Sequence, residues 1–277
     1  LKLKKAFNLP WIADFRDFWF SRPIEMIYGT SLQKKYALRL KSRIVECADA
    51  VVGVNESITH YLERGEVITN GSDQETRHLW QGRRPERQDR LTIGILGTVN
   101  HLCPIEPLFK AVATLFDAEK QVRDKIKIIH VGEYDRQLMA VLINKYKLEN
   151  VVNLAGYLPK AKAIEALLPS DVLYFSVAEF GPYHILPGRI FDYLMSSRPI
   201  IGVVPAGSDA EKFLREYDNG ITITDSNADR IAAYIKQMTE SPGSGSNQTA
   251  FDKSKCEKYS TEYMAKKYAE LLNRVVK

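Results

Sequence analysis

The hydrophobic positions from about residue 90 onward form short, nearly continuous runs separated by longer amphipathic stretches. Such runs are typical of strands that are buried on both faces, whereas half-exposed strands alternate apolar and polar residues. They predict six strands, at residues 91–96, 126–131, 151–154, 171–177, 199–204 and 221–224. Because strands that alternate with helices form βαβ units, we expect a Rossmann-like, doubly wound parallel sheet with right-handed crossovers.

Two of the intervening stretches have the spacing of an amphipathic helix, with one apolar face for the sheet. In residues 105–118 this face consists of Leu108, Val112, Leu115 and Phe116. In residues 136–146 it consists of Leu138, Val141, Leu142 and Tyr146.

The first 75 residues repeat this alternation in miniature. Strands are predicted at residues 10–15, 50–54 and 66–69, with a helix at 56–64 and another that carries Ala37, Leu40, Ile44 and Ala48. The chain starts without Met and runs almost at once into the first of these strands. Since three strands do not close a domain of this type, we interpret this part as the end of a domain whose beginning is missing.

The remaining segments connect or close the fold. Residues 74–90 are polar, basic and aperiodic, which favours a connector or surface loop, and residues 241–248 are rich in Gly and Ser. A last helix is expected at about 260–276, capped by Ser260 or Thr261. Its apolar face consists of Met264, Tyr268, Leu271, Leu272 and Val275. We therefore predict a partial first domain (1–75), a second domain (76–258) and a C-terminal helix (259–277) that packs on either domain.

Composition narrows the class of function. The chain has 45% hydrophobic and 26% charged residues and a net charge of +5, with its Lys and Arg spread along the sequence. No basic stripe with interleaved aromatics indicates a nucleic-acid surface, so anionic small molecules or a membrane surface are the expected partners.

The three cysteines and the lack of long apolar runs bear on the compartment. Cys47, Cys103 and Cys256 are odd in number and lack metal-ligand spacing, so we expect neither a disulfide framework nor a metal site. No run approaches the ~18 apolar residues of a membrane span. We expect a cytoplasmic protein, with peripheral association at the inner membrane face as a further expectation.

Ligands of parallel α/β sheets bind beyond the carboxyl ends of the strands, which draws attention to four loops. The first loop is Gly97-Thr98-Val99-Asn100, where glycine permits close approach to a phosphate, although the loop alone favours a tight turn. The second contains Glu133, and the third contains Tyr157 and Leu158; turn chemistry explains either equally well.

The fourth loop runs from Glu179 through His184 to Pro187, Gly188 and Arg189. Pro187 occupies a favoured first helical position, which places Arg189 in the first turn. A cation there opposes the helix dipole, but a bound phosphate would reverse that preference. Three residues on, Asp192 has the spacing to share a helix face with Arg189 and to accept bonds from a ribose diol. The alternative is a surface Arg189–Asp192 ion pair.

Two further sets of residues stay open. Arg16 and Asp17 close the first predicted strand, and they either line a cleft between domains or tie down a loop. His130 lies inside a buried strand and is interpreted as a core histidine with satisfied hydrogen bonds.

In these segments the sequence resembles the family 4 glycosyltransferases, retaining enzymes of the GT-B fold. The likeness covers nearly the whole chain, and the segment 186–202 (LPGRIFDYLMSSRPIIG) carries most of it. It also includes residues 9–19, 48–62 and 67–73. The resemblance implies that Arg189 is catalytic and holds the diphosphate of a UDP- or GDP-sugar, and that Asp192 holds its ribose. The loops at 97–100 and 157–159 would approach the phosphates and base.

Three departures from the family pattern concern the donor site. The family has two glutamates eight positions apart, where this chain has His184 and Asp192. Arg189 stands where some members carry Lys, and no Arg-and-Lys pair is evident in residues 97–110.

The resemblance implies transfer of a sugar, with retention, to the hydroxyl of a carbohydrate or lipid-linked acceptor, as in cell-surface polysaccharide or glycoconjugate synthesis, without a cofactor or metal. We expect donor binding but little or no transfer by this chain alone. A sugar-nucleotide epimerase or hydrolase, or a non-catalytic nucleotide-sugar-binding module, remains an alternative.

Overall fold

The computed structural model describes residues 2–19, 30–81, 90–179, 185–240 and 257–276. These residues separate into two compact units. One unit contains the chain up to Gly71 and the C-terminal helix, and the other begins at Ser72. The predicted domain boundaries after residues 75 and 258 stay predictions, because compact packing does not assign a role to either part.

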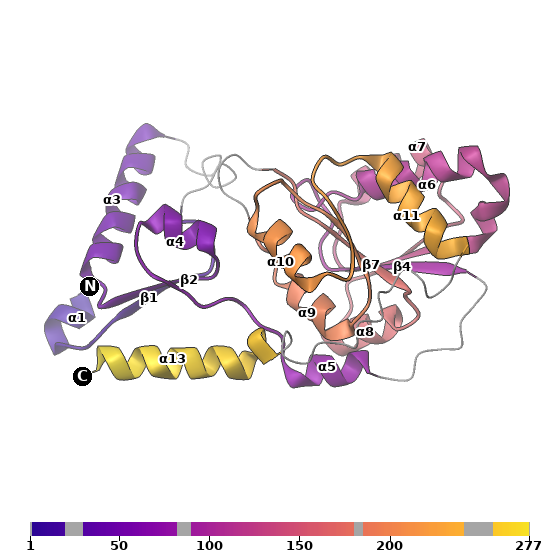
Figure 1. Cartoon of the computed structure of the whole chain (residues 1–277). Helices are drawn as coiled ribbons and strands as arrows, with labels where there is room; N and C mark the ends of the chain where they lie inside the picture. Colours follow the sequence, from indigo (N-terminus) through magenta and orange to yellow (C-terminus); the bar gives the residue numbers. More distant parts are fainter. Residues whose placement is uncertain (1, 20–29, 82–89, 180–184, 241–256, 277) are drawn as a thin grey trace. The chain divides into compact units, whose positions relative to one another are not determined.

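The larger unit is built on a six-stranded sheet (Figure 1) in the order β6-β5-β4-β7-β8-β9, with every neighbouring pair parallel. The strands are β4 (Leu91–Leu96), β5 (Ile126–Val131), β6 (Val152–Gly156), β7 (Val172–Ser176), β8 (Ile200–Val203) and β9 (Gly220–Ile223). From β4 the chain moves outward to β6, then returns to β7 and moves the other way. The predicted doubly wound parallel sheet is therefore confirmed.

Helices cover both faces of this sheet (Figure 1). One face carries α6 (Glu106–Ala118), α7 (Arg136–Tyr146) and α11 (Ala228–Glu240), and a short 3-10 helix, η1 (Lys120–Lys125), follows α6. The other carries α5 (Gln74–Trp80), α8 (Lys160–Leu167), α9 (Arg189–Ser196) and α10 (Asp209–Tyr217). The predicted face of α6 is confirmed, since Leu108, Val112, Leu115 and Phe116 are all buried.

Three predictions for this unit were wrong in part. Residues 74–80 form helix α5 rather than a loop, because Asp73 caps the helix and Trp80 is buried despite the polar composition around it. On α7, Leu138 and Val141 are exposed, whereas Leu142 faces the core as predicted, together with Met139. Strand β6 is only half-buried, because it lies at the edge of the sheet.

The smaller unit has three parallel strands in the order β1-β2-β3: β1 (Ile12–Phe15), β2 (Ala50–Gly53) and β3 (Glu66–Val67). Its helices are α1 (Lys2–Phe7), α3 (Ser31–Cys47), α4 (Glu56–Leu62) and α13 (Thr261–Val275). The sequence analysis missed α1, which has no buried residue to give it an amphipathic pattern.

Helix α13 starts as predicted, because the Ser260 side chain accepts a hydrogen bond from the backbone of Tyr263. Met264 and Leu271 pack with Val52 and Ile68 on the three-stranded sheet. The predicted apolar face is too wide, since Leu272 is half exposed.

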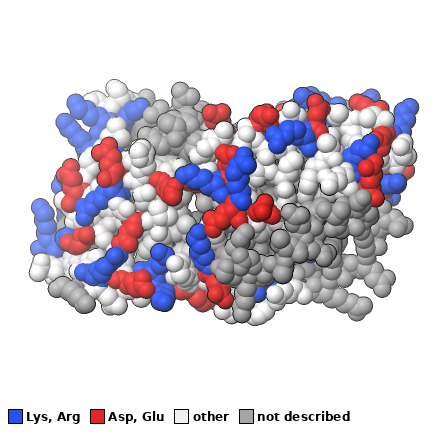
Figure 2. All heavy atoms as spheres, in the orientation of Figure 1, with Lys and Arg blue, Asp and Glu red and all other residues white. Residues whose placement is uncertain are grey.

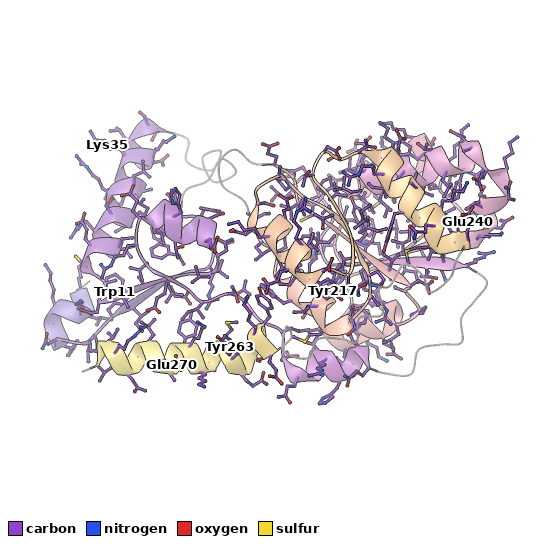
Figure 3. The ribbon with its side chains drawn as sticks, in the orientation of Figure 1. Trp11, Lys35, Tyr217, Glu240, Tyr263 and Glu270 are labelled. Atoms are coloured by element: carbon purple, nitrogen blue, oxygen red, sulfur yellow. The ribbon has the colours of Figure 1, made fainter. Side chains whose placement is uncertain are left out.

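A buried arginine joins the turns beneath the larger sheet. Arg198 follows α9 and donates from Nε to the Ser170 carbonyl at 2.8 Å and from Nη2 to the Leu168 carbonyl at 2.7 Å. Its guanidinium lies 4.8 Å from the ring centroid of Trp80 on α5, and Tyr217 on α10 (Figure 3) donates to its carbonyl. Through its side chain and its carbonyl, this residue therefore connects the ends of α5, α8, α9 and α10.

We expect Arg198→Ala to lower the free energy of unfolding by about 2–4 kcal/mol, because hydrogen bonds from a charged donor are lost and buried carbonyls are left without a partner. The control is Arg215→Ala, which removes an exposed ion pair with Glu211 on α10 and should cost less than ~1 kcal/mol. Urea denaturation measures both. Equal midpoints for the two variants would contradict the structural role of Arg198.

Candidate active site

The candidate site lies where the strand order reverses, at the carboxyl ends of β4 and β7. These strands pair directly, with Ile93 opposite Val172 and Gly94 opposite Leu173. Their crossovers leave in opposite directions, and this divergence is what forms a ligand crevice in open parallel sheets. The loops here comprise residues 97–100 after β4 and, within the described part of the larger unit, residues 177–179 and 187–188 after β7.

Arg189, the first residue of α9, reaches back over both strand ends. Its Nη1 donates to the carbonyls of Leu96 (3.3 Å) and Thr98 (2.8 Å), and its Nη2 donates to the carbonyl of Ser176 (3.2 Å). The guanidinium carbon also lies 5.3 Å from the Phe175 ring centroid. The side chain therefore bridges β4 and β7 at the point of reversal.

Not every N–H group of Arg189 has a hydrogen-bond acceptor. A guanidinium carries five N–H donors, and the three carbonyls use three of them. The Nε atom is buried and has no partner among the described residues. Because a buried, unpaired donor on a cation is costly, this atom marks a place where an acceptor would stabilise the structure.

The loop after β4 allows this approach because it begins with glycine. Gly97 has φ +91°, and a Cβ there would lie 3.4 Å from Cδ and Nη1 of Arg189. From the other side, a Cβ on Gly132 would lie 2.3 Å from the Gly97 carbonyl oxygen. The loops after β4 and β5 therefore meet backbone to backbone, which only glycine allows.

Tyr193 was not among the residues selected from the sequence, but its side chain forms hydrogen bonds with both β4 and β7. Its hydroxyl accepts a hydrogen bond from the Leu96 backbone at 2.8 Å and donates to the Tyr174 carbonyl at 3.1 Å. Burial raises the pKa of Tyr193 above its ordinary value, so the hydroxyl keeps its proton. Its position one turn after Arg189 was visible in the sequence, but its hydrogen bonds across two strands were not.

Asp192 has partners other than Arg189, so the alternative of an Arg189–Asp192 ion pair was wrong. Its Oδ1 accepts a 2.6 Å hydrogen bond from the Ser72 hydroxyl and lies 3.3 Å from Nζ of Lys160. The same ammonium lies 3.6 Å from a carboxylate oxygen of Asp73. The carboxylate is thus held from the segment before α5 and from the start of α8, by residues that no local pattern marks.

The other predicted donor residues have local roles in the structure. Pro187 and Gly188 precede α9 rather than opening it, because their carbonyls accept the first i to i+3 bonds, from Ile190 and Phe191. The Asn100 side chain closes its own turn by accepting from the Leu102 and Cys103 backbones.

The remaining candidates line the carboxyl edge of the sheet more loosely. Val99 is buried, and its N–H donates to the Glu133 carbonyl. Tyr157 is exposed and Leu158 is half-buried, in the turn that leads to Lys160. Glu133 and Glu179 are exposed, and His184 lies outside the described residues.

Arg16 belongs to a network within the smaller unit. It donates to Asp14 (2.9 Å), Asn70 (3.1 Å) and the hydroxyl of Tyr268 on α13 (2.5 Å). Burial, and then the charge of Asp14, raise the pKa of Tyr268 to about 12. These contacts lie within the smaller unit, and a role of Arg16 in lining a cleft between domains stays a prediction; Asp17 is exposed beside it.

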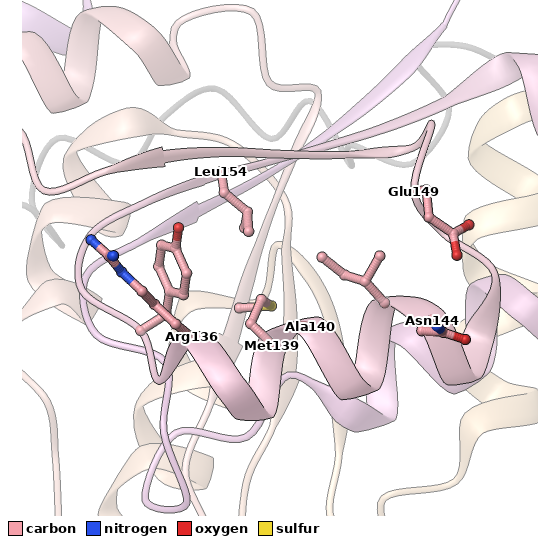
Figure 4. A pocket seen from close by; sticks show the side chains of 8 residues that line it. Arg136, Met139, Ala140, Asn144, Glu149 and Leu154 are labelled. Carbon is pink, nitrogen blue, oxygen red and sulfur yellow. The ribbon is translucent and has the colours of Figure 1, made fainter.

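A hollow elsewhere in the larger unit holds none of the predicted donor residues. It lies between α7 and the edge strand β6 (Figure 4), with a volume of about 540 Å³. Leu154 of β6 and Met139 of α7 line it from opposite sides, with Arg136 at one end and Glu149 at the other. Within the described chain no group of three or more His, Cys, Asp or Glu side chains could hold a metal, and no helix is long and apolar enough to cross a membrane.

No family model and no curated protein matches the sequence. Solved structures match with 96–100% of this chain covered. TarM from S. aureus, in a complex that includes UDP, has a TM-score of 0.69 at 16% identity, with 51% of TarM covered. HepE from Anabaena, in complex with UDP, has 0.74 at 14%, with 74% covered. A glycosyltransferase from Rickettsia africae has 0.70 at 14%, with 79% covered.

These similarities confirm the predicted fold class, the Rossmann-like parallel sheets of GT-B glycosyltransferases. The chain spans about half the length of TarM and about three quarters of HepE. At such low identities the likeness establishes the fold, and the function has to be argued from the site.

His130 is the buried titratable group next to the site. Its Nε2 lies 2.8 Å from the Gly97 carbonyl and donates to it, while Nδ1 is buried without a partner among the described residues. The prediction of a fully satisfied core histidine was therefore half right. Burial lowers the pKa of His130 below its ordinary value of 6.5, because the charged ring would place an unpaired N–H in the core.

This pKa shift predicts a loss of stability in acid. Above pH 6.5 His130 is neutral in both states; below it, the unfolded chain takes up a proton that the folded chain refuses, so the free energy of unfolding falls by up to about 1.4 kcal/mol per pH unit. His130→Gln, which retains a donor for Gly97, should flatten this dependence between pH 7.5 and 5.5. The exposed His78→Gln serves as the control, and identical slopes for both variants in urea titrations would refute the assignment.

Proposed function

We propose that this chain is the donor-binding part of a retaining glycosyltransferase that uses a nucleoside diphosphate sugar. One observation carries the proposal: a guanidinium held at the reversal point of a parallel sheet, with a buried Nε–H that lacks an acceptor. An oxygen of a diphosphate is an acceptor of the right charge and size for that donor.

The surrounding residues supply the other contacts of such a donor. The diphosphate lies between Arg189, the loop at Gly97 and the N-terminus of α9, whose dipole favours an anion. Asp192 accepts the ribose hydroxyls, while Ser72 and Lys160 hold its Oδ1 in place. The turn at Tyr157 and Leu158 contacts the base.

The solved structures favour uridine as the base to test first. TarM and HepE were both crystallised with UDP, and each shares the fold of this chain. GDP-sugars remain the second class of donor. The acceptor is a hydroxyl of a carbohydrate or lipid-linked glycan, in the synthesis of a polysaccharide or glycoconjugate.

In the transfer step, the acceptor oxygen forms a bond to the anomeric carbon, with retention, as the bond to the diphosphate oxygen breaks. The nucleoside diphosphate leaves with an added negative charge, which Arg189 and the α9 N-terminus stabilise, and the acceptor proton passes to the departing phosphate or to solvent. These protein groups take the role that a metal has in other transferases, so we expect no metal requirement.

Calorimetric titration of Arg189→Ala tests the phosphate contact. UDP binding should weaken by about 1.5–3 kcal/mol, while uridine binding changes little, because only the diphosphate loses a charged hydrogen bond. Arg215→Ala controls for loss of a positive charge. If the wild-type chain binds neither UDP nor GDP at millimolar concentration, or if Arg189→Ala binds UDP as well as wild type, the diphosphate lies elsewhere.

A second titration tests the ribose contact. Asp192→Asn should weaken UDP binding by about 1–2 kcal/mol and should weaken binding of 2′-deoxy-UDP much less, because the carboxylate accepts from the missing hydroxyl. Asp229→Asn, at an exposed position in the first turn of α11, changes the charge equally and should leave both affinities unchanged. Equal losses for the two nucleotides would exclude a contact between Asp192 and the 2′-hydroxyl.

A further inference from the structure

Helix α3 has two faces of different character. Its inner face packs on the smaller unit through Ala37 and Val45. Its outer face consists of Leu32, Lys35, Tyr36, Arg39 and Arg43, which follow the i, i+3, i+4, i+7, i+11 spacing of one helix side and are all exposed. We refer to these five residues as the α3 outer face; Lys35 is labelled in Figure 3.

This helix and α1 carry an excess of positive over negative side chains. Together α1 and α3 contain eight Lys or Arg residues and one acidic residue, Glu46. Their surplus of seven positive charges exceeds the net charge of +5 for the whole chain, so the remainder is net −2. Figure 2 shows basic atoms on the surface that α3 presents.

Large apolar side chains lie among these cations. Leu32 is 78% exposed and Tyr36 is 71% exposed. At the opposite end of α3, α1 exposes Leu3 and Phe7, and Lys4 joins α1 to the last turn of α3 by donating to the Cys47 carbonyl at 2.8 Å. Packing on the core gives no reason to place leucine and tyrosine on the opposite side of the helix.

We propose that the α3 outer face binds the surface of an anionic membrane. A helix of this kind lies in the plane of the interface, with its apolar side chains among the headgroups and its Lys and Arg facing lipid phosphates. Leu32 and Tyr36 supply the apolar part, and Lys35, Arg39 and Arg43 supply the charge. Membrane contact would bring a soluble donor to a lipid-linked acceptor, but the proposal itself concerns the smaller unit and is independent of the donor site.

Other occupants fit the same surface less well. Two copies of this chain would bring like charges together, which disfavours a homodimer through this face. A nucleic acid would satisfy the cations but would leave Leu32 in water, since phosphate contacts use basic and polar side chains.

Vesicle co-sedimentation of the full chain tests the proposal. The chain should bind vesicles of phosphatidylcholine mixed with phosphatidylglycerol more tightly than phosphatidylcholine alone, and high salt should weaken the binding. Lys35→Glu/Arg39→Glu should lower the partition coefficient on the order of tenfold or more. Leu32→Ser/Tyr36→Ser should lower it at every salt concentration, because it removes the apolar part.

The matched control is Lys120→Glu/Lys125→Glu on η1, which changes net charge equally at exposed positions and should shift the coefficient less than ~2-fold. Equal melting temperatures and unchanged UDP affinity show that the outer-face variants remain folded. The proposal is overturned if vesicles are not bound, or if control and outer-face variants bind alike. It is also overturned if the outer-face variants abolish self-association or nucleic-acid binding but leave vesicle binding intact.

Discussion

Where the strand order reverses, the chain leaves the adjacent strands β4 and β7 in opposite directions, and main-chain carbonyls at or just after the two strand ends accept hydrogen bonds from a side chain. In this protein three such carbonyls, from Leu96, Thr98 and Ser176, share the guanidinium of Arg189. The cation satisfies the acceptors and fixes the start of α9 against both halves of the sheet. The buried Nε–H group of Arg189 has no acceptor among the described residues.

Much of the surrounding structure serves to keep this cation in place. Gly97 and Gly132 let two loops meet backbone to backbone, and His130 stays neutral while it donates to the Gly97 carbonyl. Tyr193, one helical turn after Arg189, links β4 to β7 through two hydrogen bonds of its hydroxyl. These groups are held by packing before any ligand arrives, and such preorganisation is what makes an electrostatic site effective.

The sequence predicted the parts of this arrangement that depend on local pattern. Strands β4 and β5 and helix α7 were predicted with their observed bounds, because long apolar runs and helical spacing are local signals. Arg189 and Asp192 could be selected as site residues, since a cation in a first turn conflicts with the helix dipole. Their partners could not be predicted. Ser72 and Lys160 reach Asp192 from segments that are distant in the sequence, and only the fold brings them together. Helix α5 was missed for a related reason, since its burial depends on Trp80 meeting Arg198.

The central claim is that Arg189 combines a structural role with recognition of a diphosphate. Its most direct test is a crystal structure of this chain soaked with UDP. We predict a phosphate oxygen within hydrogen-bonding distance of Nε of Arg189, with the contacts of Nη1 and Nη2 to Thr98 and Ser176 retained. A UDP molecule bound away from the ends of β4 and β7, or an Arg189 side chain that leaves those carbonyls when UDP binds, would contradict the claim.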